Sequence, residues 1–449
     1  MLVRDFIHDS LYNPHYGYFS RRVEIFSPVE PLNFNQMAES AELDATVARL
    51  YREYDSTSDP RDVTGSRQIW HTPTELFKPY YGYAIAQCLV SEYLLKYFPY
   101  EDLVIYEIGA GNGTLALNIL DFLKAHYPEV YDRTQYHIVE ISSRLAERQR
   151  NLLLPRHSMV KINNKDIFAW DTQVYSPCYF LAVEVVDNFP HDAVRYSLNA
   201  SKPYQGLIAL TNSGGIQEVW EPAEDPLILR YLEYQKVIKP GAGPAGFNRF
   251  SPYMNQLRRL LPFAPNLTET EYLPTKLMTL LELLSQRFPL HRLLLTDFFK
   301  LPDTIDGHNA PVVQTRVKND MIPCSTLAVQ PGYFDIFFPT SFEALRDLYE
   351  TVLSRPLTSA SARNARPSPL STAATPLRIG ADYFLSNKYG RRSPLDGMTS
   401  TSGLPIGQRQ SSVYTHREFM EKYADLEGTR LQSGENPMLD FYQNVKVLF

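Results

Sequence analysis

Cysteine is scarce in this sequence, which argues against a structural metal site. The 449 residues contain three cysteines, and these lie far apart, at Cys88, Cys178 and Cys324. No CxxC motif or Cys/His cluster is present, so we expect no zinc site and no other metal centre. An odd and sparse set of cysteines is typical of a reducing compartment.

Long apolar runs and an excess of positive charge are also missing. The apolar runs are no longer than a strand, as at residues 293–295, whereas a membrane-spanning helix needs about 20 apolar residues. The net charge of −6 provides no overall attraction for nucleic acid or an anionic membrane. The first ten residues carry Asp5 and Asp9 and lack the Arg- and Ser-rich pattern of a transit peptide. We therefore expect no nucleic-acid partner and no membrane span, and no transit peptide is visible.

Composition divides the chain into four expected segments. Residues 1–100 form a helical N-terminal extension, in which residues 73–98 have the pattern of a largely apolar helix. Residues 101–345 alternate between strand and helix patterns and form a core with insertions. Residues 346–413 are rich in Ser, Pro, Thr, Arg and Gly and are expected to be a flexible segment. Residues 414–449 regain apolar and aromatic residues and are expected to dock back on the fold.

The core begins with a strand, a glycine-rich turn and a helix. Residues 103–106 are a continuous apolar run, which is typical of a buried parallel strand. Residues 109–113 are glycine-rich, and Leu115, Ile119 and Leu123 then recur at helical spacing. Further strands are predicted at residues 136–139, 179–183 and 293–296, and a second helix at residues 142–153. This alternation predicts an α/β fold, with a parallel sheet and helices on both of its faces.

The glycine-rich turn has the sequence EIGAGNGT, from Glu107 to Thr114. Glycines between a strand and a helix let the backbone turn tightly and let a ligand approach closely. A dinucleotide fingerprint is G-x-G-x-x-G/A, but Thr114 occupies the last position of that pattern. Glu107 would repel a pyrophosphate at the helix N-terminus and would attract the sulfonium and ammonium groups of S-adenosylmethionine. We therefore predict an S-adenosylmethionine site, rather than a dehydrogenase site, that includes Glu107, Gly109, Gly111, Asn112 and Gly113.

Two further acids follow the next strands. Glu140 ends the predicted strand at residues 136–139, where an acid in a Rossmann-like fold accepts hydrogen bonds from ribose hydroxyls. Asp166 falls where a third strand could end and could accept from an adenine amino group, with Ile141 and Ile167 beside the ring. The alternative is that these acids are only solvated charges at strand ends.

The segment EVVDNFPHD, which begins at Glu184, holds the candidate catalytic residues. Ligands bind outside the carboxyl ends of parallel strands, so this loop is expected to face the methyl donor. Carboxylates can hold and orient a guanidinium, and Glu184 and Asp187 are therefore the candidates. His191 could instead be a general base for another acceptor. The alternative for Asp187 is a turn, built with Asn188 and Pro190.

Several of these motifs together resemble the MidA-type family. The sequence NPHYGY at residues 13–18 resembles its N-terminal signature, and residues 107–113 and 137–142 look like its cofactor-binding motifs. Residues 184–190 look like its E-x-x-D-x-x-P segment. The resemblance covers roughly residues 3–345. It implies a class I, Rossmann-like S-adenosylmethionine-dependent methyltransferase with additional N-terminal and C-terminal helices.

The family contains a mitochondrial complex I assembly factor that is a protein arginine methyltransferase. The resemblance therefore implies symmetric dimethylation of an arginine on a complex I subunit in the mitochondrial matrix. Three motifs depart from the family pattern: HTPTE at residues 71–75, DFF at residues 297–299 and PGYFD at residues 331–335. These departures fall on the expected acceptor side. A non-catalytic complex I assembly chaperone and a small-molecule methyltransferase are the alternatives.

Overall fold

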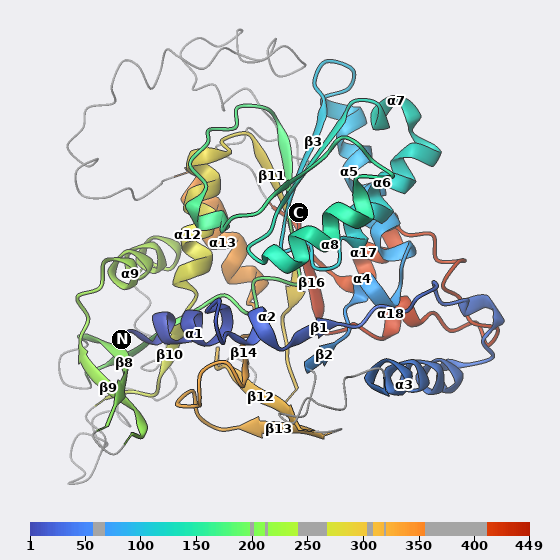
Figure 1. Ribbon diagram of the computed structural model, residues 1–449. Coiled ribbons are helices and arrows are strands. Elements are labelled where there is room, and N and C mark those ends of the chain that lie inside the picture. Colours follow the sequence, from blue (N-terminus) through green and yellow to red (C-terminus); the bar gives the residue numbers. More distant parts are fainter. Residues whose placement is uncertain are drawn as a thin grey trace, which may run out of the picture. The chain divides into compact units, whose positions relative to one another are not determined.

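The computed structural model describes most of the chain, in eight stretches (Figure 1): residues 1–56, 68–197, 202–211, 214–240, 267–302, 309–317, 320–354 and 411–449. The chain forms two compact units, each assembled from three separate segments. The parallel-sheet unit comprises Glu24–Val185, Glu282–Phe299 and Thr358–Phe449. The antiparallel unit comprises Met1–Val23, Val186–Leu281 and Lys300–Leu357.

A seven-stranded sheet is the centre of the parallel-sheet unit. Its strands are β3 (Leu103–Ile108), β4 (Thr134–Val139), β5 (Val160–Asn163), β6 (Cys178–Val183), β11 (His291–Phe298), β15 (Val413–Thr415) and β16 (Val445–Leu448). Their order is β15-β16-β11-β6-β3-β4-β5. The five strands from β11 to β5 are parallel, and β16 is antiparallel to both β11 and β15.

The strand order reverses between β3 and β6. These strands are neighbours in the sheet, with Ile108 paired to Ala182, although β4 and β5 lie between them along the chain. From β3 the chain proceeds through β4 to β5 on one side, and β6 and β11 lie on the other side. In open α/β sheets, ligands bind at the carboxyl ends of the strands beside such a reversal.

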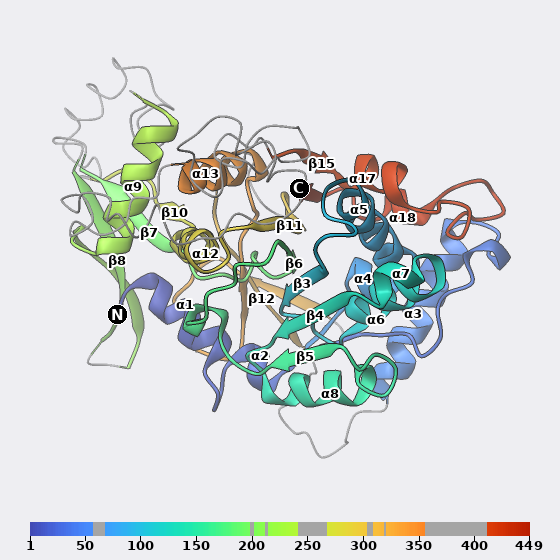
Figure 2. The same cartoon turned by 90° about the horizontal axis from the view of Figure 1, so that it is seen from above.

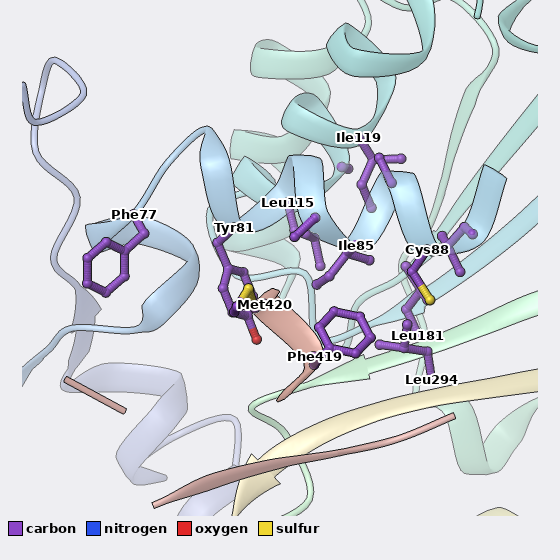
Figure 3. Close-up of a cluster of buried hydrophobic side chains, with 14 of the residues drawn as sticks. Phe77, Tyr81, Ile85, Cys88, Leu115, Ile119, Leu181, Leu294, Phe419 and Met420 are labelled. Carbon is purple, nitrogen blue, oxygen red and sulfur yellow. The ribbon is translucent and has the colours of Figure 1, made fainter. Parts of the chain in front are cut away.

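One face of the sheet is covered by three helices, α5 (Tyr80–Lys96), α6 (Thr114–His126) and α17 (His416–Tyr423) (Figure 3). Ile85, Ile119 and Phe419 come from these helices and pack with Leu181 and Leu294 of the sheet. Burying a side chain of this size contributes about 1.5–3 kcal/mol. This face therefore supplies much of the stability of the unit.

The opposite face is covered by aromatic side chains. Phe288, which follows α12 (Thr275–Arg287), has its ring centroid 5.0 Å from that of Tyr106 and 5.4 Å from that of Phe180. Trp170 completes the group, with its ring 5.4 Å from that of Phe288. Both faces of the central strands are thus buried, which explains their continuous apolar sequences and confirms the predicted parallel sheet.

The remaining short elements and helices of the parallel-sheet unit surround this sheet. They are η1 (Phe34–Gln36), α3 (Ser40–Ser56), β2 (Gln68–Trp70), α4 (Pro73–Leu76), α7 (Pro128–Tyr131), α8 (Ser143–Leu153), η2 (Ile167–Ala169) and α18 (Pro437–Asp440). The strand β1 (Val23–Ile25) begins at the unit boundary and pairs with β2. Figure 2 shows α8 beside β5. The single helix expected at residues 73–98 is interrupted before Tyr80, because Pro79 has no backbone N–H to donate.

The antiparallel unit contains two smaller sheets. Its helices are α1 (Val3–Tyr12), α2 (Tyr18–Arg21), α9 (Pro226–Ile238) and α13 (Phe342–Ser354). One sheet has the order β10-β7-β8-β9: β10 (Glu271–Leu273), β7 (Asp192–Tyr196), β8 (Pro203–Leu210) and β9 (Ile216–Pro222). The other has the order β13-β12-β14: β13 (Asp320–Cys324), β12 (Val312–Val317) and β14 (Asp335–Phe337). Arg4 on α1 forms two ion pairs within this unit. Its Nη2 atom lies 2.6 Å from Oδ2 of Asp225, and its Nη1 atom lies 2.8 Å from Oδ2 of Asp192.

The four expected segments are each continuous along the chain, whereas each observed unit is assembled from separate segments. The division into four consecutive segments therefore stays a prediction. Residues 355–410 of the expected flexible segment lie outside the described residues. Residues 414–449 provide β16, which lies between β15 and β11 in the sheet and pairs with both. Within the described stretches, no helix is both long enough and apolar enough to cross a membrane.

Candidate functional site

The loop between β3 and α6 depends on glycine for its conformation. Gly109 and Gly111 have φ angles of 63° and 52°, in the left-handed region that L side chains rarely adopt. A Cβ atom at Gly109 would lie 2.9 Å from Cγ2 of Val185, and one at Gly111 would lie 2.8 Å from Cδ1 of Ile25. Gly113 is the N-cap of α6 and is also left-handed. A side chain at Gly109 or Gly111 would therefore be both strained and crowded, and the backbone there stays open to a closely approaching ligand.

Glu140 lies immediately after β4 and is joined to the glycine loop by Gln149. The Nε2 atom of Gln149 donates to the carbonyl of Gly111 at 2.9 Å and to Oε2 of Glu140 at 3.0 Å. The backbone N–H of Ser142 donates to the other carboxylate oxygen at 2.8 Å. Burial raises the pKa of Glu140, and these hydrogen bonds oppose the rise.

Gln149 was not among the residues predicted from sequence. A signal for it exists, because it shares a buried face of α8 with Ala146 and Leu153 at helical spacing. A polar residue on a buried helix face usually has a polar partner. Its Oε1 atom is buried and has no hydrogen-bond partner among the described residues.

Glu107 lies near the end of β3 and is buried, although a charged residue at the end of a strand is usually exposed to solvent. Its side chain is 2% exposed, and the hydroxyl of Tyr136 donates to Oε2 at 2.8 Å. Burial and the nearby Glu140 raise the pKa of Glu107 and the hydrogen bond from Tyr136 lowers it, so that the pKa is about 8. At neutral pH the carboxyl group therefore keeps its proton in the free protein. A bound cation beside it would favour the charged form.

Asn112 and Thr114 connect the loop to Glu75 on α4. The Nδ2 atom of Asn112 donates to Oε1 of Glu75 at 2.7 Å, and the hydroxyl of Thr114 donates to the same oxygen at 2.9 Å. Thr72 caps α4 by accepting from the N–H of Glu75. Glu75 ends the HTPTE segment at residues 71–75, for which no role was predicted from sequence. The Oδ1 atom of Asn112 is buried and has no hydrogen-bond partner within the described stretches.

The residues predicted beside the adenine ring have different environments. Ile141 is 50% exposed, whereas Ile167 is buried. Asp166 follows β5, which ends three residues earlier at Asn163, and it caps η2 by accepting from the N–H of Phe168 at 2.9 Å. Contact of these three residues with an adenine stays a prediction.

Glu184, directly after β6, belongs to a cluster of three acids. It is partly exposed, and its φ of 55° is the one left-handed φ at a non-glycine residue in the described chain. The hydroxyl of Thr74 donates to Oε1 at 3.4 Å. Desolvation raises the pKa of Glu184 well above its ordinary value, and the charges of Asp297 and Glu75 raise it further. Both of these neighbours are buried, so Glu184 is the acid of the cluster that a solute can reach.

Asp187 lies in the antiparallel unit, in a loop held by β14. Its Oδ1 atom accepts from the N–H of Asn188 at 2.9 Å, and its carbonyl accepts from the N–H of Phe338 at 2.8 Å. Asn188 also donates to Asp335 at 2.9 Å, and burial raises the pKa of that acid to about 7. The turn-forming contact expected as an alternative role is present. It does not exclude a second role for the other carboxylate oxygen.

His191 is buried in the same unit. Its ring stacks on Phe338 with centroids 3.8 Å apart, and Nδ1 donates to the carbonyl of Phe189 at 2.7 Å. Burial lowers the pKa of His191 to about 4. These contacts favour a structural role over a general base. Among the described residues, no group of His, Cys, Asp and Glu is arranged to hold a metal ion.

The chain matches a known family over most of this region. Residues 84–358 match the model of a family described as "Putative S-adenosyl-L-methionine-dependent methyltransferase". The chain belongs to this family, and its α/β fold is that of a class I, Rossmann-like methyltransferase with additional helices near both ends. The protein is an S-adenosylmethionine-dependent methyltransferase.

One curated relative and two solved structures describe the similarity further. The relative is the "Protein arginine methyltransferase NDUFAF7 homolog, mitochondrial" of Schizosaccharomyces pombe, 28% identical over 369 residues, which cover 78% of this chain and 75% of the relative. A Burkholderia thailandensis protein crystallised with S-adenosyl-homocysteine is 16% identical, with a TM-score of 0.46 over 78% of this chain and 71% of that one. A native crystal structure from the same organism is 15% identical, with a TM-score of 0.44 over 78% of this chain and 70% of that one.

The residues at the ends of β3 and β4 fit this cofactor. The loop leaves no space for a Cβ at Gly109 or Gly111, and the unpaired oxygens of Asn112 and Gln149 can accept from a ligand's N–H or O–H groups. Glu140 presents a carboxylate where ribose hydroxyls bind in Rossmann-like folds. The cofactor supplies, when bound, a methyl group on a positively charged sulfur.

Proposed function

We propose that this protein is a protein arginine methyltransferase that symmetrically dimethylates an arginine on a subunit of mitochondrial complex I, in the matrix. The name of the Schizosaccharomyces pombe relative supports arginine as the acceptor and the mitochondrion as the location. The resemblance to the MidA-type family supports the complex I subunit and the symmetric product.

The position of Glu184 is the observation that carries this proposal. The residue follows β6, the neighbour of β3, and the adjacent Val185 lies against the glycine loop. Its carboxyl group is partly exposed, whereas Glu75 and Asp297 beside it are buried. A carboxylate accepts hydrogen bonds from a guanidinium in one plane, which fixes the orientation of the acceptor nitrogen.

The residues divide between cofactor and acceptor. Glu107, the glycine loop and Glu140 hold the cofactor, with Ile141, Asp166 and Ile167 on its adenine side. On the acceptor side we assign Glu184 to the guanidinium, and the same role for Asp187 stays a prediction from sequence. A guanidinium cannot be deprotonated beforehand, so orientation and charge alignment lower the barrier. Burial favours the protonated form of Glu184 in the free protein, and a guanidinium bound beside it would favour the carboxylate. That carboxylate can then take the proton that the methylated nitrogen releases.

Calorimetry with S-adenosylmethionine, and with NAD as the control ligand, is the first half of the test. The second half is incubation with methyl-labelled S-adenosylmethionine and isolated complex I subunits, followed by amino-acid analysis of the labelled protein. We expect the label in symmetric dimethylarginine. Label in small molecules alone would favour a small-molecule methyltransferase, and cofactor binding without transfer would favour an assembly chaperone.

The matched variants are Glu184→Gln and Glu421→Gln. Glu421 lies on α17 and its side chain is half exposed, so its substitution is expected to leave both binding and transfer unchanged. Glu184→Gln keeps the size of the side chain and removes its charge. Equal transfer by the two variants would contradict the role given to Glu184.

A further inference from the structure

Glu75 on α4 is a buried acid that contacts the glycine loop directly. Its side chain is 3% exposed, and its Oε1 atom accepts from Nδ2 of Asn112 at 2.7 Å and from the hydroxyl of Thr114 at 2.9 Å. Asn112 belongs to the glycine loop, and Thr114 is the first residue of α6. These two hydrogen bonds hold the carboxylate against the cofactor loop, although Glu75 and Asn112 are 37 positions apart in the chain.

The burial of this acid requires an explanation, because removing a charge from water is costly. The ammonium group of Lys78 lies 3.8 Å from the Oε2 atom of Glu75 and offsets part of that cost. Lys78 donates to Oγ of Ser27 at 2.7 Å, and Oε2 of Glu75 has no hydrogen-bond partner among the described residues. A neutral glutamine of almost the same size could also accept from Thr114 at lower cost. The charge of Glu75 is therefore retained for another reason.

The carboxylate fixes the orientation of the Asn112 side chain. An amide has one end that donates and one end that accepts, whereas a carboxylate only accepts. The reversed amide would place two acceptor oxygens against each other, so the NH2 group of Asn112 must face Glu75. The same nitrogen donates to the carbonyl of Ile25 at 3.4 Å. The Oδ1 atom of Asn112 is thereby directed away from Glu75, and it has no hydrogen-bond partner within the part of the chain that the structure describes.

The unpaired oxygen of Asn112 lies in the loop that the cofactor approaches. Asn112 follows Gly111, which is partly exposed and where the backbone stays open to a ligand. S-adenosylmethionine has hydrogen-bond donors on its adenine, on its ribose and on the ammonium group of its methionine part. Glu140 and Asp166 are the residues expected beside the ribose and the adenine, which leaves the ammonium group for the glycine loop. An ammonium group only donates, so it needs an oxygen from Asn112 and would repel an NH2 group.

We propose that Glu75 is a positioning residue for the cofactor: it holds the Asn112 amide so that the amide oxygen accepts a hydrogen bond from the ammonium group of S-adenosylmethionine. The negative charge of Glu75 polarises that amide through one hydrogen bond and makes its oxygen a stronger acceptor. The neighbouring Thr74 donates to Glu184, so consecutive residues of α4 contact the cofactor loop and the candidate catalytic acid. Because the family match supplies the cofactor, this role does not depend on the identity of the acceptor.

Two glutamate substitutions separate this role from ordinary support of the core. Glu75→Gln keeps the size of the side chain but can present an NH2 group to Asn112, which allows the amide of Asn112 to reverse. Glu92→Gln is the matched control, because Glu92 lies on α5, is 5% exposed and forms an ion pair with Lys96 at 3.0 Å. Each variant loses one buried charge that forms an ion pair, so both are expected to shift the melting temperature. Glu75→Gln alone should change the recognition of the ammonium group.

Calorimetry with two ligands measures that recognition. One ligand is S-adenosyl-homocysteine, and the other is its deamino analogue, in which hydrogen replaces the amino group. Glu75→Gln should bind S-adenosyl-homocysteine about tenfold more weakly than the wild type does, as expected for one lost hydrogen bond to a charged group. Its affinity for the deamino analogue should be unchanged, and Glu92→Gln should bind both ligands as the wild type does. Unchanged binding of S-adenosyl-homocysteine by Glu75→Gln, or an equal loss of affinity for both ligands, would show that Glu75 only supports the loop.

A double variant tests the orientation of the amide itself. When Glu75→Gln is combined with Asn112→Asp, the donor and the acceptor exchange places: the glutamine NH2 group donates to one oxygen of the aspartate, and the other oxygen faces the ammonium group. We expect the double variant to bind S-adenosyl-homocysteine at least as tightly as the wild type, because a carboxylate accepts from a cation more strongly than an amide does. Binding no tighter than that of Glu75→Gln would overturn the proposed orientation.

Discussion

The loops that follow β3 and β6 leave neighbouring parallel strands, yet they place left-handed backbone on different kinds of residue. After β3 the left-handed positions are Gly109, Gly111 and Gly113, and a side chain at the first two would lie too close to its neighbours. After β6 the left-handed position is Glu184. Glycine adopts this conformation at little cost, whereas an L side chain pays about 1–2 kcal/mol.

The difference indicates what each loop contributes to the site. The first loop has glycine at its left-handed positions, so it provides space and backbone groups for the cofactor. The second loop retains a carboxylate in a conformation that glycine would adopt more easily. Strain of this kind concentrates at functional sites. The comparison therefore predicts that substitutions in the first loop affect cofactor binding, and that substitutions in the second affect transfer.

Gly111→Val should produce the largest effect. A β-branched side chain at φ 52° would meet Ile25 and enter the space of the cofactor, so we expect the affinity for S-adenosylmethionine to fall at least 100-fold, roughly the energy of two lost hydrogen bonds. Calorimetry measures this change. Gly434→Val is the matched control, because Gly434 is also left-handed but has open space around it. Equal losses of affinity would attribute the effect to backbone strain alone.

Glu184→Gln should lower kcat about 100-fold, which is the order of magnitude found when one preorganised electrostatic contact is removed. The affinity for the cofactor should be retained.

Glu184→Gly and Glu184→Ala test the left-handed strain at this position. Both remove the carboxylate, but glycine relieves the left-handed strain, so the glycine variant should be more stable than the alanine variant by about 1 kcal/mol. Urea denaturation gives the stabilities. If the alanine variant is equally stable, the strain is absent.

Asp187→Asn should lower methyl transfer about tenfold, the effect expected of one weakened charge-assisted contact. An asparagine oxygen can still accept from the N–H of Asn188, so the fold and cofactor binding should be preserved. Single-turnover transfer and cofactor calorimetry are the measurements. Unchanged transfer would leave Asp187 with its turn-forming role alone.

Glu107→Gln should change stability rather than methyl transfer, and the change should depend on pH. The folded pKa of Glu107 is about 8, above the ordinary carboxyl value of 4.5, so the native state holds a proton that the unfolded state releases. The wild type therefore loses stability between pH 4.5 and about 8, and the variant does not. The difference in melting temperature should be near zero at pH 4.5, grow to pH 8 and then stay constant. A difference that does not change with pH would contradict the shifted pKa.

Cofactor binding offers a second measurement on Glu107. If the positive charge of the cofactor lies beside this carboxyl group, binding at pH 7 should release a proton. Calorimetry in two buffers of different ionisation enthalpy detects that release in the wild type and should detect none in Glu107→Gln. Equal proton release by both proteins would place the cofactor's charge elsewhere.

The strands and helices around the cofactor loop could be predicted from sequence because local patterns determine them. The apolar run at residues 103–106 became β3, and the helical spacing of Leu115, Ile119 and Leu123 became α6. Glycines at fixed positions after a strand carry their own conformational meaning, so the loop was recognisable before its φ angles were known.

The acid cluster could not be predicted from spacing, because contacts between distant segments create it, although the family resemblance placed the segments of Glu75 and Asp297 on the expected acceptor side. Glu75, Glu184 and Asp297 come from three parts of the chain, and no local spacing connects them. The strand β16 could not be predicted either, since four residues give no periodicity and its pairing with β11 depends on tertiary contacts. Gln149 left only the weak signal of a polar residue on a buried helix face.

The pairing of β16 with β11 has a consequence for how the protein is made. During synthesis on the ribosome, β3, β4, β5, β6 and β11 emerge well before β16, so the sheet has an open edge beside β11 until residues 445–448 arrive. An exposed strand edge invites pairing with other chains, and a chaperone would have to shield it. A chain cut short in this interval would carry the complete glycine loop but would lack the strand that covers β11.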